Sequence, residues 1–182
     1  MYPLSHNTLS GLVALFTRIE VPRGTVILRE GYIEKDMFLV EQGLVRAYSD
    51  AAEKQVTFWF GMSGDYVISA QSFINNRPGY ESIDVLEDSV LYKANAEALI
   101  ALFEKDIELA NWGRKLAENE FLKLEEMFIS RQFKTATQVY IELLERIPSF
   151  PNRVPLKHIA SYLGISQVSL SRIRANVAKG II

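Results

Sequence analysis

The side chains best suited to recognition chemistry lie near the end of the chain, in the stretch SQVSLSRIR, residues 166–174. Glutamine can hydrogen-bond to the edge of adenine, valine can touch the methyl group of thymine, and arginine can bind guanine or a phosphate. Gln167, Val168 and Arg172 supply these three types, and on a helix Arg172 would lie one turn beyond Val168. Ser169 is placed to contact a base or a phosphate. We therefore expect this stretch to read the major groove of double-stranded DNA.

The residues around this stretch have the spacing of a helix-turn-helix. Such a unit needs a small residue where its two helices cross and a residue that accepts positive φ at the turn, and Ala160 and Gly164 supply them. Ser166 is placed to cap the second helix. Five apolar residues are expected to pack the two helices together: Ile159, Leu163, Ile165, Leu170 and Ile173. The same spacing would also suit a helical pair that contacts another protein.

The charge of the chain is unevenly distributed. Residues 146–182 contain six Lys or Arg and no Asp or Glu, whereas the preceding residues contain the other 14 basic and all 22 acidic side chains. A segment without acidic residues favours a polyanionic partner, although a solvated basic face would have the same composition. Within this segment, three side chains are expected to contact the DNA backbone: Lys157, Ser171 and Arg174.

The composition excludes several kinds of site. The chain has no cysteine and only two histidines, His6 and His158, so disulfides, thiolate zinc sites, iron–sulfur clusters and histidine metal clusters are not expected. A jelly-roll enzyme usually carries histidine ligands on its strands, and the strand-like part of this chain, residues 20–92, contains no histidine. We expect no metal, no cofactor and no enzymatic activity. Without a membrane span or a signal sequence, the chain is expected to be soluble and cytoplasmic.

Residues 20–92 have the pattern of a small β-structure. Short runs rich in β-branched and aromatic residues alternate with glycines: TVILRE, DMFLVEQ, LVRAYSD, QVTFWF, DYVIS and SVLYK. Strands this short and evenly spaced indicate an antiparallel barrel or jelly roll. Alternation places Leu44, Arg46 and Tyr48 on one face of their strand and Val45 and Ala47 on the other, without showing which face is inward.

The pattern becomes helical after Ala94. Asn95 is suited to cap the first helix, and a long helix follows whose smaller and apolar residues form a seam at steps of three and four: Ala110, Gly113, Ala117, Phe121, Leu124 and Phe128. The small residues at its start would permit close approach of another helix. This seam could pack on the chain's own barrel, but its length favours a homodimer. A further helix, TATQVYIELLER, is followed by IPSFPN, which indicates a linker or tight turn.

These segments together resemble the Crp-Fnr family of bacterial transcription regulators over nearly the whole chain. GTVILREG to EQGLVRAY looks like the family's cyclic-nucleotide-binding-like jelly roll, and IASYLGISQVSLSRIR looks like its DNA-reading motif. The resemblance implies an α+β fold with a sensor domain at 1–94, a dimerisation helix at 95–130 and a helix-turn-helix domain at 131–182. It also implies phosphate contacts by Ser166 and Ser169, and half-sites about 34 Å apart.

The implied partners are double-stranded DNA, a second copy of the chain, RNA polymerase and an unidentified small-molecule effector. Many members of the family continue into a β-hairpin wing where this chain ends in AKGII. The wing is therefore expected to be truncated or absent. The alternative function is a small-molecule-binding module whose helical tail contacts a protein partner.

The stretch NNRPGYESID, residues 75–84, and the residues before it look like a loop that could grip an anion. In cyclic-nucleotide-binding members, a Gly-Glu pair and an Arg-Ser or Arg-Thr pair hold the phosphate. Gly64 and Asp65 match the first pair and Ser82 matches the terminal serine, but Glu81 stands where the arginine belongs. A carboxylate about 4 Å from a phosphate would cost roughly 4 kcal/mol at an effective dielectric near 20, which disfavours cyclic AMP.

Arg77 could replace the missing charge, but we expect it to be a solvated loop arginine that pairs with Glu81 or Asp84. The sensor domain would then bind another small molecule, bind nothing, or serve only as a scaffold for the dimer.

Overall fold

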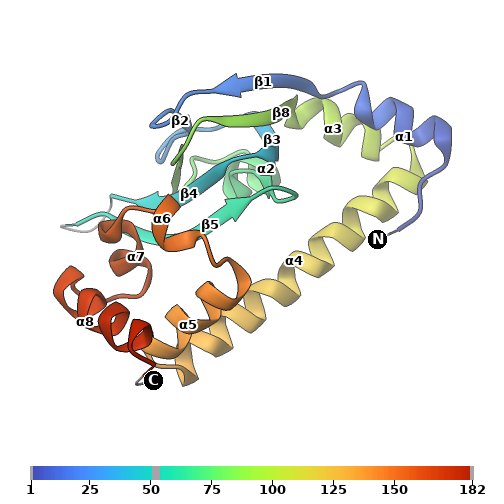
Figure 1. Ribbon diagram of the computed structural model, residues 1–182. Helices are drawn as coiled ribbons and strands as arrows, with labels where there is room; N and C mark the ends of the chain where they lie inside the picture. Colours follow the sequence, from blue (N-terminus) through green and yellow to red (C-terminus); the bar gives the residue numbers. More distant parts are fainter. Residues whose placement is uncertain (1, 51–53, 181–182) are drawn as a thin grey trace.

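The computed structural model describes residues 2–50 and 54–180. A short helix, α1 (His6–Val13), leads into a jelly roll whose strands form two antiparallel four-stranded sheets, in the orders β1-β8-β3-β6 and β2-β7-β4-β5 (Figure 1). The strands of the described ranges are β1 (Thr17–Val21), β2 (Val26–Leu28), β3 (Asp36–Gln42), β4 (Leu44–Ser49), β5 (Val56–Met62), β6 (Tyr66–Val67), β7 (Ser82–Val85) and β8 (Ser89–Asn95). The expected jelly roll is confirmed.

The core of the jelly roll lies between the two sheets. Leu28, Val40, Val45, Val85 and Leu91 are each at most 1% exposed there. Because side chains alternate along a strand, the inward position of Val45 sends its neighbours on β4 to the outer face of the second sheet. The same packing therefore decides which face of β4 is inward.

Two elements around the stretch of residues 75–84 differ from the sequence-based expectation. The segment between Gly64 and Glu81 contains a helix, α2 (Ala70–Asn75), which ends at Asn76 in a left-handed conformation with φ of 49°. Strand β7 begins at Ser82, inside the stretch expected to be a loop, and pairs with β4 from Tyr48↔Ser82 to Val45↔Val85. The polar residues Ser82 and Asp84 weaken the strand pattern in the sequence. In the structure, pairing with β2 and β4 stabilises this strand.

Two helices connect the jelly roll to the C-terminal part. Asn95 caps α3 (Ala96–Phe103) as expected, because its Oδ1 accepts a hydrogen bond from Ala98 N at 3.1 Å. Asp106 caps the next helix, α4 (Ile107–Phe133), which has 27 residues and runs diagonally past the jelly roll (Figure 1). The chain thus breaks at Glu104–Asp106 before its long helix begins.

The C-terminal unit consists of four helices in the described part of the chain: α5 (Ala136–Arg146), α6 (Phe150–Arg153), α7 (Leu156–Tyr162) and α8 (Gln167–Ala178). The segment IPSFPN, expected to be only a linker or turn, contains the start of α6, whose Phe150 is 1% exposed. Its proline is tolerated because it lies in the first turn of the helix.

The core of the C-terminal unit is shared with the jelly roll. Leu44, Phe60 and Leu86 of the second sheet and its following turn belong to the same buried cluster as Phe150 and Leu170. The two parts of the chain are therefore packed together as one body. Within residues 2–50 and 54–180, every helix is too short or too polar to cross a bilayer, and no three metal-ligating side chains are grouped as an ion would need.

Candidate nucleic-acid interface and effector loop

Helices α7 and α8 form the helix-turn-helix. Gly164 has a φ of +68°, a left-handed conformation that glycine adopts without strain, so its role at the turn is confirmed. The amide of Ile165 donates to Ala160 O at 3.0 Å and closes the turn. Ser166 Oγ accepts from Ser169 N at 3.1 Å, which confirms the expected cap. Ala160 and Leu170 are buried where the two helices pack.

The outward face of α8 carries the expected base-reading residues. Gln167, Val168 and Arg172 are exposed, with Val168 at 64%. Two further expected contacts, Ser171 on α8 and Lys157 on α7, are also exposed. A cluster of solvent-facing side chains on a capped helix is the geometry that a major groove admits.

The remaining expected contacts are less accessible. Ser169 is half-buried, and its hydroxyl lies 2.9 Å from the Ser166 hydroxyl, so both serines already serve the cap. Arg174 is half-buried and faces the first part of the unit, where its charge opposes the burial that raises the pKa of Tyr140 on α5.

The expected effector residues do not all come together. Gly64 and Asp65 form the turn between β5 and β6, where Asp65 Oδ2 accepts from Met62 N at 2.9 Å. In the described ranges no hydrogen bond joins this turn to Glu81 or Ser82. The side chain that faces Glu81 is instead Ser69, which sequence reasoning did not select.

Glu81 is buried in the chain's own loop at 5% exposure. Burial raises the pKa of its carboxyl and the charge of Glu30 raises it further, although the Ser69 hydroxyl and the Tyr80 amide favour the charged form. Gly79 lets the loop close here, because a Cβ on it would lie 2.4 Å from Ser69 Oγ. A phosphate beside Glu81 would therefore meet a carboxylate where it needs a cation.

Ser82 and Arg77 have other environments than a phosphate cradle would provide. Ser82 Oγ accepts from Glu30 N at 3.0 Å and is buried, whereas Arg77 is exposed. The expectation that Arg77 pairs with Glu81 or Asp84 is wrong: among the residues that the structure describes Arg77 forms no ion pair, and Asp84 binds Arg46.

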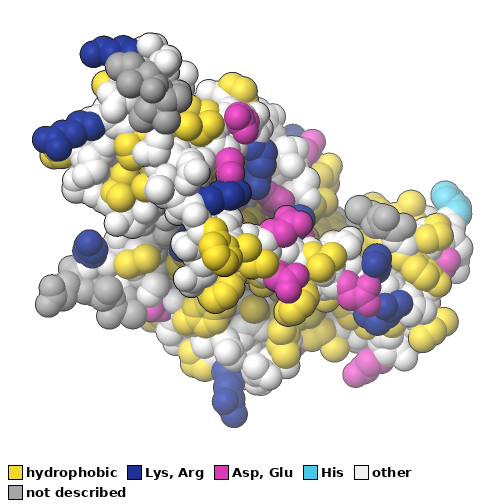
Figure 2. All heavy atoms as spheres, turned by 90° about the horizontal axis from the view of Figure 1, so that it is seen from below, with side chains coloured by type: hydrophobic (Ala, Val, Ile, Leu, Met, Phe, Trp, Pro, Cys, Tyr) yellow, Lys and Arg dark blue, Asp and Glu magenta, His cyan; other side chains and the backbone are white. Residues whose placement is uncertain are grey.

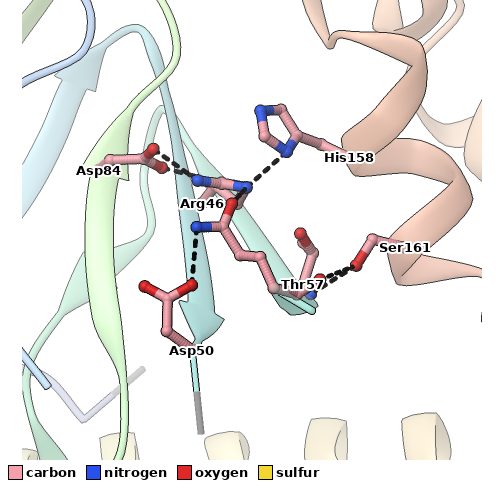
Figure 3. A network of polar contacts seen from close by, with 7 residues as sticks. Arg46, Asp50, Thr57, Asp84, His158 and Ser161 are labelled. Carbon is pink, nitrogen blue, oxygen red and sulfur yellow. Dashed lines mark hydrogen bonds and ion pairs between the residues drawn. The ribbon is translucent and has the colours of Figure 1, made fainter. Parts of the chain in front are cut away.

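Arg46 is the centre of a buried polar network between the jelly roll and the helix-turn-helix (Figure 3). It is 3% exposed, and its Nε and Nη2 donate to the two carboxylate oxygens of Asp84 at 3.0 and 2.7 Å. Its Nη1 donates to Gln55 Oε1 at 2.6 Å and also contacts Nδ1 of His158 on α7. The guanidinium carbon lies 4.1 Å from the centre of the Tyr48 ring.

The contact with Arg46 determines the protonation state of His158. A guanidinium has only donors, so His158 Nδ1 must be the acceptor and the ring must be neutral. Burial lowers the pKa of His158 to about 4, and the charges of Arg46 and Lys157 contribute. The histidine is therefore neutral at neutral pH.

Further contacts join the two parts of the chain. Ser161 Oγ on α7 accepts from Thr57 N at 2.9 Å and donates to Gln55 O at 3.0 Å. Arg153 on α6 binds Glu87 in the turn after β7, with Nη2 and Oε1 2.6 Å apart. The ring of Phe60 packs edge-on against Phe150 at 5.0 Å between centres. Backbone, ionic and aromatic contacts all fix the same arrangement.

Known proteins share this architecture. Residues 18–106 match the family described as the cyclic nucleotide-binding domain. FixK2 from Bradyrhizobium japonicum superposes with a TM-score of 0.75 at 17% identity, over 92% of this chain and 86% of that one. A protein described as a transcriptional regulator of the Crp/Fnr family, from Eubacterium rectale, gives 0.75 at 19% identity over 97% and 85%. The chain has the fold of a Crp/Fnr regulator.

A third solved structure also matches nearly the whole of both chains. The c-di-GMP responsive global regulator CLP from Xanthomonas campestris matches with a TM-score of 0.69 at 16% identity, over 97% of this chain and 93% of that one. No curated protein matches the chain significantly by sequence. These identities support the Crp/Fnr fold and leave function to be argued from the residues.

Sequence reasoning missed the residues that hold this Crp/Fnr fold together at its centre. Arg46 was assigned to a strand without a role, Asp84 was considered only as a partner for Arg77, and His158 was considered only as a metal ligand. The one local signal is an arginine between the hydrophobic residues of β4, at a position that would otherwise carry an apolar side chain. Its partner on α7 is 112 residues away.

A cleft of about 600 Å³ lies between β5, α4 and α5. Trp59 and Tyr162 contribute rings to its wall, Arg131 and Arg146 contribute cations, and Glu142 contributes a carboxylate. Arg131 is already engaged, because it donates to Phe58 O at 3.2 Å and lies 5.0 Å from the centre of the Tyr162 ring.

Proposed function

We propose that this chain is a sequence-specific DNA-binding transcription regulator of the Crp/Fnr type that acts as a homodimer. The observation that carries the proposal is the exposed face of α8, where Gln167, Val168 and Arg172 lie together on a helix that is capped by Ser166. The absence of acidic residues from 146 to 182 supports a polyanionic partner for this face.

The proposed dimer uses α4. Phe121, Leu124 and Phe128 are 67, 58 and 64% exposed at helical spacing, and a monomer rarely leaves such a stripe in water. Figure 2, seen from below, shows broad hydrophobic areas interspersed with carboxylates on the side where α4 and α5 lie. A two-fold dimer through this stripe would present two copies of α8 to a palindromic site.

Only part of the expected seam is available to a partner. Gly113 packs against α3 of the same chain, because a Cβ on it would lie 2.7 Å from Phe103 Cζ. Its small size therefore serves the contact between α3 and α4. The proposed dimer interface is the second half of α4, from Phe121 onward.

We propose that cyclic AMP is not the effector of this chain. Glu81 is buried beside Ser69, with the charge of Glu30 close by, so a phosphate at this position would meet carboxylates. RNA polymerase and a small molecule of other chemistry are the remaining proposed partners, and no enzymatic activity is proposed.

The experiment that tests the proposal is selection of bound duplexes from random DNA by the purified chain, with and without a metabolite extract. We expect a palindrome whose half-sites are about 34 Å apart, and an affinity that falls steeply with salt as phosphate contacts release counterions. Recovery of no common sequence, or binding that is independent of salt, would refute the assignment. The arm with extract shows whether an effector is needed.

A further inference from the structure

The Arg46–Asp84 pair lies on the outer face of the second sheet, where a strand pair would normally meet water. The two residues are direct neighbours across β4 and β7, and Val45 beside Arg46 points into the jelly-roll core. Even so, Arg46 is 3% exposed and the side chain of Asp84 is 14% exposed. Helix α7 covers the pair through His158 and lies along β5 through Ser161.

A buried arginine of this kind depends on all its partners. The guanidinium is satisfied by the carboxylate of Asp84, the amide oxygen of Gln55 and the ring nitrogen of His158. Two of these partners belong to the jelly roll, and His158 belongs to the helix-turn-helix. If α7 moved away, Arg46 would exchange His158 for water; if Asp84 lost its charge while α7 stayed, a cation would remain buried without compensation. The docking of α7 and the ion pair are therefore linked.

Strand β7 connects this pair to residues 76–81, the loop between α2 and β7 that is called the effector loop here. It begins at Ser82, directly after Glu81, and Asp84 is only two residues further on. The turn after β7 carries Glu87, which binds Arg153 of α6. Asp84, which binds Arg46, thus lies on β7, and Glu87, which binds Arg153, lies two residues beyond its end. A shift of this strand would move both attachment points together.

The covalent link between α4 and the C-terminal unit is short. Only Lys134 and Thr135 separate α4 from α5, and Lys134 is in an extended conformation with φ of −104° and ψ of 142°. Rotation of the C-terminal unit about this link would require its contacts with the second sheet to separate. These contacts therefore decide where the recognition helix lies.

We propose that the Arg46–Asp84 pair is a clamp that holds the helix-turn-helix on the sensor sheet and ties its position to β7. The clamp transmits a change at the effector loop to α7 within one protomer, independently of the α4 stripe. The inference rests on the proposed function only in naming α8 as the DNA-reading helix. The clamp itself is measured without DNA, so its failure is distinguishable from failure to bind DNA.

The first test compares Asp84→Asn with Asp36→Asn by hydrogen exchange on the full chain. Asp36 is the matched control because it also pairs with a strand cation, Lys93 at 2.8 Å, but on the opposite sheet. We expect the amides of α7 and α8 to exchange about tenfold faster in Asp84→Asn, with β1 and β8 unchanged. Asp36→Asn should leave α7 and α8 unchanged. Unaltered exchange of α7 in Asp84→Asn, or equal acceleration of both sheets, would overturn the proposal.

A second variant guards against poor folding of Asp84→Asn. His158→Ala removes only the partner on α7 and leaves the Arg46–Asp84 pair in place. It should accelerate hydrogen exchange at the same amides of α7 and α8. The transmission is tested with Glu81→Gln at the effector loop. This change should alter the exchange of α7 in the native chain and have no additional effect in Asp84→Asn. An equal effect in both backgrounds would show that the loop does not act through the clamp.

Discussion

Arg46 on the outer face of strand β4 contacts His158 on helix α7, so one buried guanidinium joins the second sheet to the helix-turn-helix. The same guanidinium forms a two-pronged ion pair with Asp84 of β7. The position of α7 and α8 is therefore set by the outer face of the second sheet as well as by the long helix α4.

Acid is expected to destabilise the fold through His158. The pKa of this histidine is about 4 in the folded chain, against about 6.5 in an unfolded one. Between these values the unfolded chain binds the proton and the folded chain does not, so the free energy of unfolding falls as the pH is lowered. The His158 contribution lost between pH 7 and 4 is about 3 kcal/mol.

Urea unfolding of the native chain and His158→Gln at pH 7 and at pH 4.5 measures this contribution. The variant should lose less stability in acid than the native chain. An identical loss in both would show that another group controls the acid transition.

Glu81→Gln is expected to stabilise the fold at neutral pH. Burial raises the pKa of this carboxyl, so the contribution of Glu81 to stability is present below the pKa of the unfolded chain and is lost as the pH rises through the folded value. Glutamine removes the buried charge and keeps an acceptor for the Tyr80 amide, which should raise the free energy of unfolding by about 1 kcal/mol at pH 7.

The gain should disappear at pH 4, where the carboxyl is protonated. Glu104→Gln, at an exposed position between α3 and α4, is the control and should have little effect at either pH. A Glu81→Gln variant that is less stable at pH 7 would mean that an ionised Glu81 is held by partners stronger than those described.

Cyclic AMP is expected not to bind at micromolar concentration. The phosphate would have to approach the buried carboxyl of Glu81 with the negative charge of Glu30 close by. Calorimetric titration of the purified chain measures this directly. Micromolar affinity would show that our interpretation of Glu81 is wrong, without affecting the assignment of α8.

Arg172→Ala is expected to abolish sequence preference. Arg172 is exposed on α8, where its guanidinium can reach a guanine edge, and its loss should cost roughly 1–3 kcal/mol at the selected site. Arg23→Ala removes an exposed arginine from the sensor and is the matched control. Fluorescence anisotropy with the selected and a scrambled duplex separates the outcomes. Equal weakening on both duplexes would make Arg172 a phosphate contact only.

Phe128→Asp is expected to weaken the proposed dimer. The ring is 64% exposed on α4, and a charge in the middle of an apolar interface between two copies would be desolvated without a partner. Ile74→Asp, at 73% exposure on α2, is the control. Sedimentation equilibrium should show a dimer for the native chain and the control, and a monomer for Phe128→Asp. A native monomer at all concentrations would contradict the α4 interface.

The sequence by itself determined the elements whose signals are local. The turn glycine, the serine cap and the apolar positions of the helix-turn-helix all fall within 20 residues, so their spacing alone predicts the unit that the structure contains. Asn95 could be recognised as a cap for the same reason. The even spacing of short strands was enough to predict a jelly roll, although β1 and β7 were not among the predicted strands.

Only the tertiary structure decided the relationships between distant segments. Alternation on β4 separated Arg46 from Val45 but could not show which of them faced the core, because the period of two is the same from either side. The partner of Arg46 on α7, the contact of Gly113 with Phe103 and the burial of Glu81 beside Ser69 depend on how helices and sheets pack. Contacts of this kind produce no periodic pattern in the sequence, because each residue is placed by a different helix, strand or loop.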